Sequence, residues 1–109
     1  MTRYTIVVER RAEDDLNEIA EYIATHDSVE RAVDVVTKIE RSFIALETFP
    51  NRGVHPKELL DYGNRDFREI YFKPYRIIYR VLEREVVVVL IADGRRDMQT
   101  LLTRRLLGA

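Results

Sequence analysis

The chain has 109 residues, no cysteine and a formal net charge of −1. This length fits one domain, which we place at residues 1–109, and the 46% of apolar residues can form its core. The composition excludes a disulfide scaffold and a thiolate zinc site. No apolar stretch approaches the roughly 20 residues of a membrane span, and the first residues do not resemble a signal peptide. We therefore expect a cytoplasmic protein with no membrane partner.

The charges are distributed unevenly along the chain. Residues 1–50 carry 6 basic and 11 acidic side chains, whereas residues 51–109 carry 12 basic and 8 acidic ones. Fifteen of the 18 basic residues are arginine. The planar guanidinium of arginine binds carboxylates and phosphates through paired hydrogen bonds, which the ammonium group of lysine does not form. A bulk nucleic-acid binder is usually basic throughout, so we expect no sequence-specific DNA binding by this chain alone. The basic half can still present one surface to an anion.

The first half of the sequence predicts a strand and two helices. Residues Arg3 to Val8 are mostly β-branched and favour a strand. Apolar residues recur every three or four positions from about Arg11 to Ala24, which predicts a helix. Asp27 and Glu30 then have the spacing of a capping box for a second helix that continues to about Thr48. Two amphipathic helices joined by so short a break should pack as an antiparallel hairpin.

In the second half the apolar period changes from 3.6 to 2 after a loop at 54–66, in which a turn of helix at Pro56 to Leu60 is one interpretation. Strands are predicted for Phe67 to Phe72, Tyr75 to Leu82 and Val86 to Ala92. Helical spacing returns from Asp97 to Leu107. The third of these strands is apolar on both sides, as expected of a central strand covered on both faces.

These elements define an α+β fold: a strand, an antiparallel two-helix hairpin, a three-stranded antiparallel sheet and a short C-terminal helix. The hairpin should cover one face of the sheet. The first strand needs a partner, and pairing with the last strand would close the sheet.

The C-terminal helix has its own apolar stripe: Met98, Leu101, Leu102 and Leu106. A helix of barely three turns is marginal in water, so it must dock. Docking over the open sheet face of its own domain is one interpretation, and contact with another protein is the alternative. In either case Arg104 and Arg105 are expected to stay outside, near the negative end of the helix dipole.

Arginines are the main candidates for a functional site. Arg76 and Arg80 share one face of their strand, because side chains alternate along a strand. Five arginines could therefore gather on one side of the sheet as an anion site: Arg68, Arg76, Arg80, Arg95 and Arg96. The alternative is that they pair with nearby acids and cover an exposed sheet face: Glu69, Glu83 and Asp97. The spacing alone favours neither.

The remaining polar and aromatic residues predict ordinary structural roles. His26 and His55 lie in predicted loops, with no partner in sequence that suggests a triad or a metal site. Five carboxylates are expected to form a solvated face of the first helix: Glu13, Asp14, Asp15, Glu18 and Glu21. Four aromatic residues are expected in the core: Tyr71, Phe72, Tyr75 and Tyr79. There is no Gly-rich phosphate loop or metal-ligand spacing, so we predict neither a cofactor nor a metal.

Three segments together resemble the RelE/ParE toxin superfamily of type II toxin–antitoxin systems. They read AEDDLNEIAEYI at 12–23, FREIYFKPYRIIYRV at 67–81 and VVVVLIADGRRD at 86–97. Their order and spacing match across nearly the whole chain. The resemblance implies a small bacterial toxin with the strand, helix-hairpin and sheet order expected above.

The superfamily has two mechanisms: RelE-like members cut mRNA in the ribosomal A site, and ParE-like members poison DNA gyrase. Arg76 and Arg96 match two arginines of the RelE pattern, and Lys73 is what remains of its lysines. The position of its tyrosine, however, falls on Leu102. No acid–base pair remains for RNA cleavage, and a pI near 6.1 fits poorly with binding to ribosomal RNA.

The resemblance therefore favours the ParE-like branch, with DNA gyrase as target and no catalytic residue. It implies a cognate acidic antitoxin, which we expect to bind the five arginines. One alternative is a RelE-like ribonuclease acting through Arg76, Arg96 and Lys73. Another is a weakly toxic member that mainly binds its antitoxin.

Overall fold

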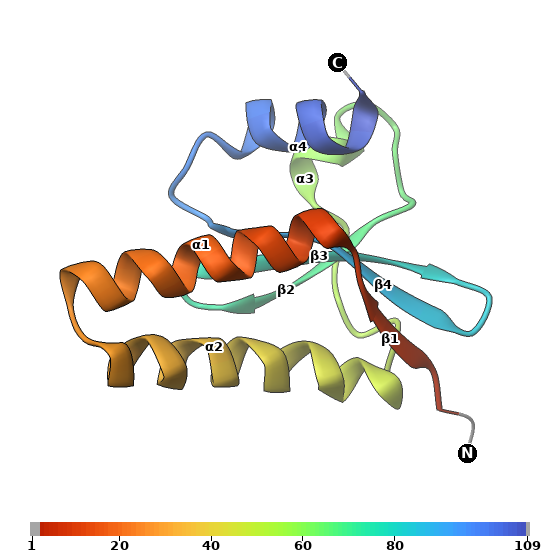
Figure 1. Ribbon diagram of the computed structural model, residues 1–109. Coiled ribbons are helices and arrows are strands. Elements are labelled where there is room, and N and C mark those ends of the chain that lie inside the picture. Colours follow the sequence, from red (N-terminus) through yellow and green to blue (C-terminus); the bar gives the residue numbers. More distant parts are fainter. Residues whose placement is uncertain (1–2, 109) are drawn as a thin grey trace.

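The computed structural model describes residues 3–108, which form four α-helices and four strands (Figure 1). In chain order the elements are β1 (Thr5–Val8), α1 (Arg10–His26), α2 (Val29–Ile44), the 3-10 turn η1 (Ala45–Glu47), α3 (Lys57–Leu60), β2 (Arg68–Phe72), β3 (Tyr75–Leu82), β4 (Glu85–Asp93) and α4 (Met98–Leu107). The predicted α+β fold and the predicted order of elements are confirmed.

The four strands form one sheet in the order β1-β4-β3-β2. Strands β2, β3 and β4 are antiparallel, as predicted. The first strand does pair with the last, but in parallel, with Thr5 opposite Glu85 and Val8 opposite Val88. The sheet is therefore mixed, and β4 is an inner strand between β1 and β3.

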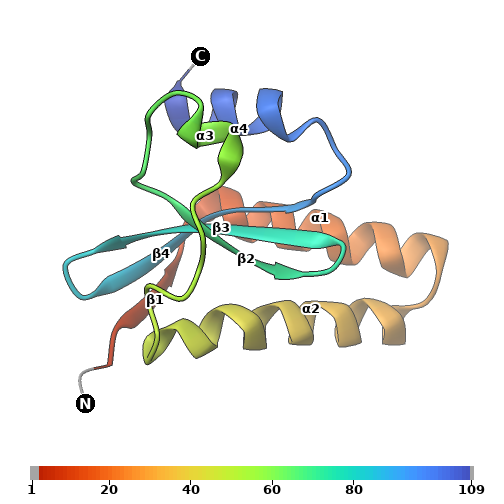
Figure 2. The ribbon, with the colours of Figure 1, turned by 180° about the vertical axis from the view of Figure 1, so that it is seen from behind.

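Helices cover both faces of the sheet (Figures 1 and 2). The α1–α2 hairpin packs on one face, where Ile77 and Tyr79 of β3 are fully buried with Ile39 of α2. On the other face Leu102 of α4 and Leu59 of α3 are fully buried in a second cluster. The C-terminal helix thus docks on its own domain, the first of the two interpretations given above.

A β-bulge interrupts the alternation of β4. Ile78 lies opposite Leu90 while the next residue, Tyr79, lies opposite Val88, so Val89 is the extra residue. Val89 and Leu90 consequently both belong to the cluster beneath α3 and α4. Since every residue from Val86 to Ala92 is apolar, the sequence contains no polar position that could have marked this shift of register.

The start of α2 differs from the prediction by one residue. Ser28, not Asp27, is its N-cap, and the Ser28 hydroxyl accepts a hydrogen bond from the backbone N–H of Arg31 at 3.0 Å. Asp27 is unavailable because its own N–H closes α1 on the carbonyl of Ile23. The predicted capping box of Asp27 and Glu30 is therefore wrong.

Asp15 and Arg105 also depart from the expected exposed positions. Their side chains are 11% and 17% exposed and form an ion pair between α1 and α4, with both guanidinium Nη atoms 3.0 Å from carboxylate oxygens. The other four carboxylates of α1 are exposed as predicted, and so is Arg104. Both groups lose contact with water here. Their mutual attraction and their hydrogen bonds to the backbone of β4 replace that lost hydration.

The backbone of β4 explains why this pair is needed. Strand β1 ends opposite Val88, so β4 has no strand neighbour on that side beyond this residue. Asp15 accepts a hydrogen bond from the N–H of Ile91 at 3.0 Å, and Arg105 donates to the carbonyl of Val89 at 3.3 Å. The two side chains thus satisfy backbone groups that would otherwise be buried without partners.

We predict that Asp15→Ala lowers the free energy of unfolding by about 2–4 kcal/mol, because it leaves Arg105 and the Ile91 N–H without their acceptor. Asp14→Ala is the matched control, since Asp14 is exposed on the same helix and undergoes the same change in helix propensity. Urea denaturation followed by circular dichroism measures both. Equal losses in the two variants would contradict a structural role for the Asp15–Arg105 pair.

Candidate functional site

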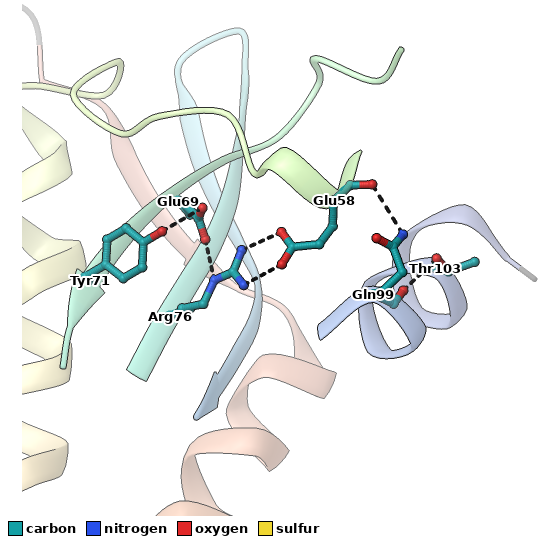
Figure 3. Close-up of polar contacts among 6 residues, drawn as sticks. All are labelled: Glu58, Glu69, Tyr71, Arg76, Gln99 and Thr103. Atoms are coloured by element: carbon teal, nitrogen blue, oxygen red, sulfur yellow. Dashed lines mark hydrogen bonds and ion pairs between the residues drawn. The ribbon is translucent and has the colours of Figure 1, made fainter. Parts of the chain in front are cut away.

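Arg76 is the most enclosed arginine of the predicted site. It is 9% exposed on the α3/α4 side of β3. Its Nε atom donates to Glu69 at 2.6 Å, and its two Nη atoms donate to the two carboxylate oxygens of Glu58 at 2.8 Å each (Figure 3). Three of its nitrogens are thus occupied by two carboxylates, one from β2 and one from α3.

Further contacts hold these carboxylates in place. Glu69 is 4% exposed and accepts a second hydrogen bond, from the hydroxyl of Tyr71 at 3.0 Å. Gln99 of α4 donates to the backbone carbonyl of Glu58 at 3.4 Å (Figure 3). The cluster therefore joins β2, β3, α3 and α4. Tyr71, predicted in the core, is 54% exposed and uses its hydroxyl here; the prediction for it is wrong, whereas Tyr79 is fully buried as expected.

The contacts within this cluster shift the pKa values of Glu58, Tyr71 and Arg76. The hydrogen bonds from Arg76 lower the pKa of Glu58, and those same bonds raise the pKa of Arg76. Burial, reinforced by the hydrogen bond to Glu69, raises the pKa of the Tyr71 hydroxyl. At neutral pH Arg76 is consequently a cation, Glu58 a carboxylate and Tyr71 a neutral phenol.

Gly94 is part of the same arrangement. A Cβ atom at this position would lie 2.9 Å from Cδ of Arg76 and 3.3 Å from the carbonyl oxygen of Pro74. Glycine at this position after β4 therefore leaves room for the side chain of Arg76.

Arg68 and Arg80 lie at a different place, near the start of β2 and the end of β3. Arg68 donates to the carbonyls of Gly53 and Asn51 at 2.8 and 3.3 Å. The Arg80 guanidinium lies over the ring of Phe67, with its carbon 5.3 Å from the ring centroid. Both residues line one pocket of about 320 Å³ together with Arg65 and His55.

Arg95 and Arg96 lie at a third place, after β4. They line a groove of about 420 Å³ whose apolar walls come from α1, β3 and β4: Ile19, Tyr22, Ile23, Tyr75 and Ile91. Arg95 is exposed and pairs with Asp93 at 2.6 Å. Lys73 lines a neighbouring pocket at the turn between β2 and β3, together with Tyr22 and His26.

The expectation that five arginines gather on one side of the sheet is therefore wrong. Arg68 pairs with Tyr79 across β2 and β3, which places it on the hairpin side, while Arg76 and Arg80 are on the other side. The alternative, pairing with nearby acids, holds for Arg76 with Glu69. Asp97 instead caps α4 by accepting from the N–H of Thr100.

Several residues of these sites had no signal in the sequence. Glu58 belongs to α3, which confirms the helical turn considered for Pro56 to Leu60, but its contact with Arg76 was not predicted, and Arg65 lies in the same predicted loop. His55, expected on the surface, is half-buried, and its Nδ1 lies 2.9 Å from the carbonyl of Phe67. Tertiary contacts bring these residues to β2 and β3, and the apolar periodicity of the sequence does not indicate such contacts.

Residues 3–108 contain neither a candidate metal-binding cluster nor a helix that could span a membrane. No group of three or more histidine or acidic side chains in that range could hold a metal ion. None of the helices there is long and apolar enough to cross a membrane.

A hairpin on a small mixed sheet, closed by a C-terminal helix, is the fold of the RelE/ParE class of toxins. Residues 6–98 match the family model described as the ParE toxin of the type II toxin–antitoxin system parDE. This match covers most of the chain, which therefore belongs to the ParE toxin family.

Known proteins resemble the chain over nearly its whole length. Toxin ParE3 of Caulobacter vibrioides is 27% identical over 100 residues, which are 92% of this chain and 96% of the relative. A structure of the chromosomal ParDE system from P. aeruginosa superposes with a TM-score of 0.70 at 19% identity, covering 84% of this chain and 96% of that one.

RelE-like structures share the fold as well. A mutant of E. coli toxin RelE in the free state gives a TM-score of 0.61 at 12% identity, over 91% of this chain and 92% of that one. A chain of the RelBE2 complex from Mycobacterium tuberculosis gives 0.57 at 21% identity, over 85% and 93%. At such low sequence identity, these solved structures show only that the fold is shared.

We predict that Glu58→Gln lowers stability at neutral pH by about 1–3 kcal/mol, because Arg76 loses its bidentate carboxylate. Because folding lowers the pKa of Glu58, its charge stabilises the native state at neutral pH, and this contribution is lost as the pH falls below about 4.3. The difference between wild type and variant should therefore shrink between pH 6 and pH 3.5 in urea titrations. The same change at exposed Glu21 is the control, and a difference that stays constant with pH would refute the assignment.

Proposed function

We propose that the chain is the toxin of a parDE-type module, that it acts on DNA gyrase in the cytoplasm, and that a cognate acidic antitoxin neutralises it. Membership of the ParE toxin family supports the toxin role. The matching structures include a ParDE system and a RelBE2 toxin–antitoxin complex, which supports an antitoxin partner.

The state of Arg76 is the observation that favours gyrase over the ribosome. A ribonuclease arginine must offer its guanidinium to the phosphate in the transition state. Here Glu58 and Glu69 occupy that guanidinium with three hydrogen bonds of 2.6–2.8 Å. A phosphate would have to displace Glu58 and would meet the negative charge of Glu69.

The other residues of the nuclease alternative support the same choice. Arg96 and Lys73 line pockets other than the one that Arg76 lines. RNA cleavage also needs a base for the 2′-hydroxyl and an acid for the leaving 5′-oxygen. His26 is stacked on Tyr22 near the end of α1, and His55 is held at the carbonyl of Phe67. His26 lines the pocket of Lys73 and His55 lines the pocket of Arg76, which are separate from the groove that Arg96 lines.

We expect the purified protein to inhibit DNA supercoiling by gyrase and to increase the amount of cleaved DNA. Cells induced without antitoxin should form filaments and show DNA damage, while a cell-free translation reaction continues at its normal rate. Primer extension on cellular messages should show no new stops. Codon-phased cuts would instead establish the RelE-like alternative, and absence of both effects would indicate a family member that mainly binds its antitoxin.

The groove beside α1 is the surface that we assign to the antitoxin. Its walls offer apolar area for a disordered segment that folds as it docks. Asp15, Glu18 and Asp93 line the groove as well, and Arg95 is paired with Asp93, so Arg96 is the groove residue that we expect to attract an acidic side chain. We exclude Arg76 from this role because its guanidinium is already paired inside the fold.

We predict that Arg96→Glu weakens the antitoxin complex by about tenfold or more at moderate salt, because it places a negative charge where an acidic segment docks. Arg104→Glu makes the same change on the exposed side of α4 and should leave the dissociation constant nearly unchanged. Calorimetric titration with the antitoxin measures both, with circular dichroism to verify folding. Equal dissociation constants for Arg96→Glu and wild type would place the antitoxin elsewhere.

A further inference from the structure

A second basic site lies beside the Arg76 cluster, with His55 lining the pockets of both, and is separate from the groove beside α1. Eight residues line this pocket of about 320 Å³, here called the three-arginine pocket: Asn51, His55, Arg65, Asp66, Arg68, Arg80, Val81 and Leu82. They come from the loop after α2, the segment that leads into β2, and the end of β3. Three arginines and a single acidic residue, Asp66, thus line one cavity at the end of the sheet where β2 begins and β3 ends.

The three arginines of this pocket have no carboxylate partner among the described residues, a property that they share with Arg96 and several exposed arginines. Arg76, Arg95 and Arg105 each form an ion pair with an acidic side chain. Over residues 3–108, by contrast, Arg65, Arg68 and Arg80 form none. Arg68 donates only to two backbone carbonyls, which fix its position without cancelling its charge.

Arg80 is also held in place while its hydrogen bonding is incomplete. Its guanidinium rests on the ring of Phe67, and its Nε atom is buried without a hydrogen-bond partner. A buried donor without a protein partner is uncommon, and a bound water or ion is a usual partner for such an atom. The guanidinium of Arg80 is thus held against Phe67 without an acidic partner.

The charge and the lining together indicate the kind of ligand. Three arginines against Asp66 give the pocket two net positive charges, which match one dianionic group. A phosphate monoester carries about 1.5–2 negative charges at pH 7. Its oxygens can accept the paired hydrogen bonds that guanidinium groups donate. Only Val81 and Leu82 are apolar, so the pocket offers little area to a peptide that must fold as it binds.

We propose that the three-arginine pocket binds a phosphate monoester, the group present on a nucleotide and at the phosphorylated end of a nucleic acid. This site is independent of the gyrase and antitoxin assignments, because it uses neither Arg96 nor the groove beside α1. Arg68 and Arg80, expected at first to hold the antitoxin, are in this view phosphate ligands.

Calorimetric titration of the full chain with inorganic phosphate tests the proposal, with sodium chloride at equal ionic strength as the reference. Arg65→Gln should weaken phosphate binding about fivefold or more, because one charge-assisted contact is lost. Asp66→Asn should tighten it about threefold, because the only carboxylate of the pocket is neutralised. Both side chains are exposed, so the variants should fold. Arg84→Gln, in the exposed turn between β3 and β4, is the matched control and should change nothing.

Two further arms identify the source of the phosphate. A nucleoside monophosphate is compared with its nucleoside, and an oligonucleotide with a 5′-phosphate is compared with the same strand lacking it. The proposal predicts that each phosphate adds affinity and that Arg65→Gln removes the gain. Phosphate heat no larger than that of chloride, or affinity equal in wild type, Arg65→Gln and Asp66→Asn, would overturn it. Sensitivity of antitoxin binding, but not of phosphate binding, to these two variants would instead make the pocket part of the antitoxin surface. Gyrase inhibition is measured separately, so its presence or absence does not affect this outcome.

Discussion

The burial of β4 is the constraint on which the rest of the fold depends. All seven residues from Val86 to Ala92 are at most 8% exposed, so this strand must be covered on both faces and satisfied along both edges. The hairpin covers one face, and α3 and α4 cover the other. Strand β3 pairs along one edge, whereas β1 reaches only Val88 on the other. Beyond that point the ion pair of Asp15 and Arg105 takes the place of a strand, which ties the C-terminal helix to the first helix.

The buried arginines have a similar structural role. Arg76 joins Glu69 of the neighbouring strand to Glu58 of α3, and Arg105 joins α4 to Asp15, which lies 90 residues earlier in the sequence. Burying such charges is costly unless every polar group finds a partner, and removal of one partner leaves an uncompensated charge. These ion pairs therefore contribute little to the total stability. Their main effect is to determine which segments of the chain contact each other. Their guanidinium groups are, for the same reason, poorly available to a ligand.

Most of the fold could be predicted from the sequence, because apolar burial decides it and apolar periodicity records burial. The change of period near Phe67 was sufficient to order the elements, and the need to pair β1 identified its partner. The bulge at Val89 and the ion pairs could not be predicted in this way. A strand that is apolar on both sides shows no register, and a polar residue such as Asp15, Glu58 or Arg105 looks exposed until another segment approaches it. Of the candidate site, the sequence therefore identified the arginines but not their partners.

The partners determine what the arginines can do. RelE-like and ParE-like proteins share this fold, and Arg76 matches an arginine of the RelE pattern, yet here two carboxylates occupy its guanidinium. An arginine in a motif is therefore a weak guide to phosphate chemistry until its neighbours are known. The useful distinction is between neutralised and unneutralised cations: Arg76 and Arg105 belong to the interior, whereas Arg65, Arg68 and Arg80 retain their charge beside a cavity. Nε of Arg80 is a buried donor without a protein partner, so a bound water or a ligand must complete its hydrogen bonding.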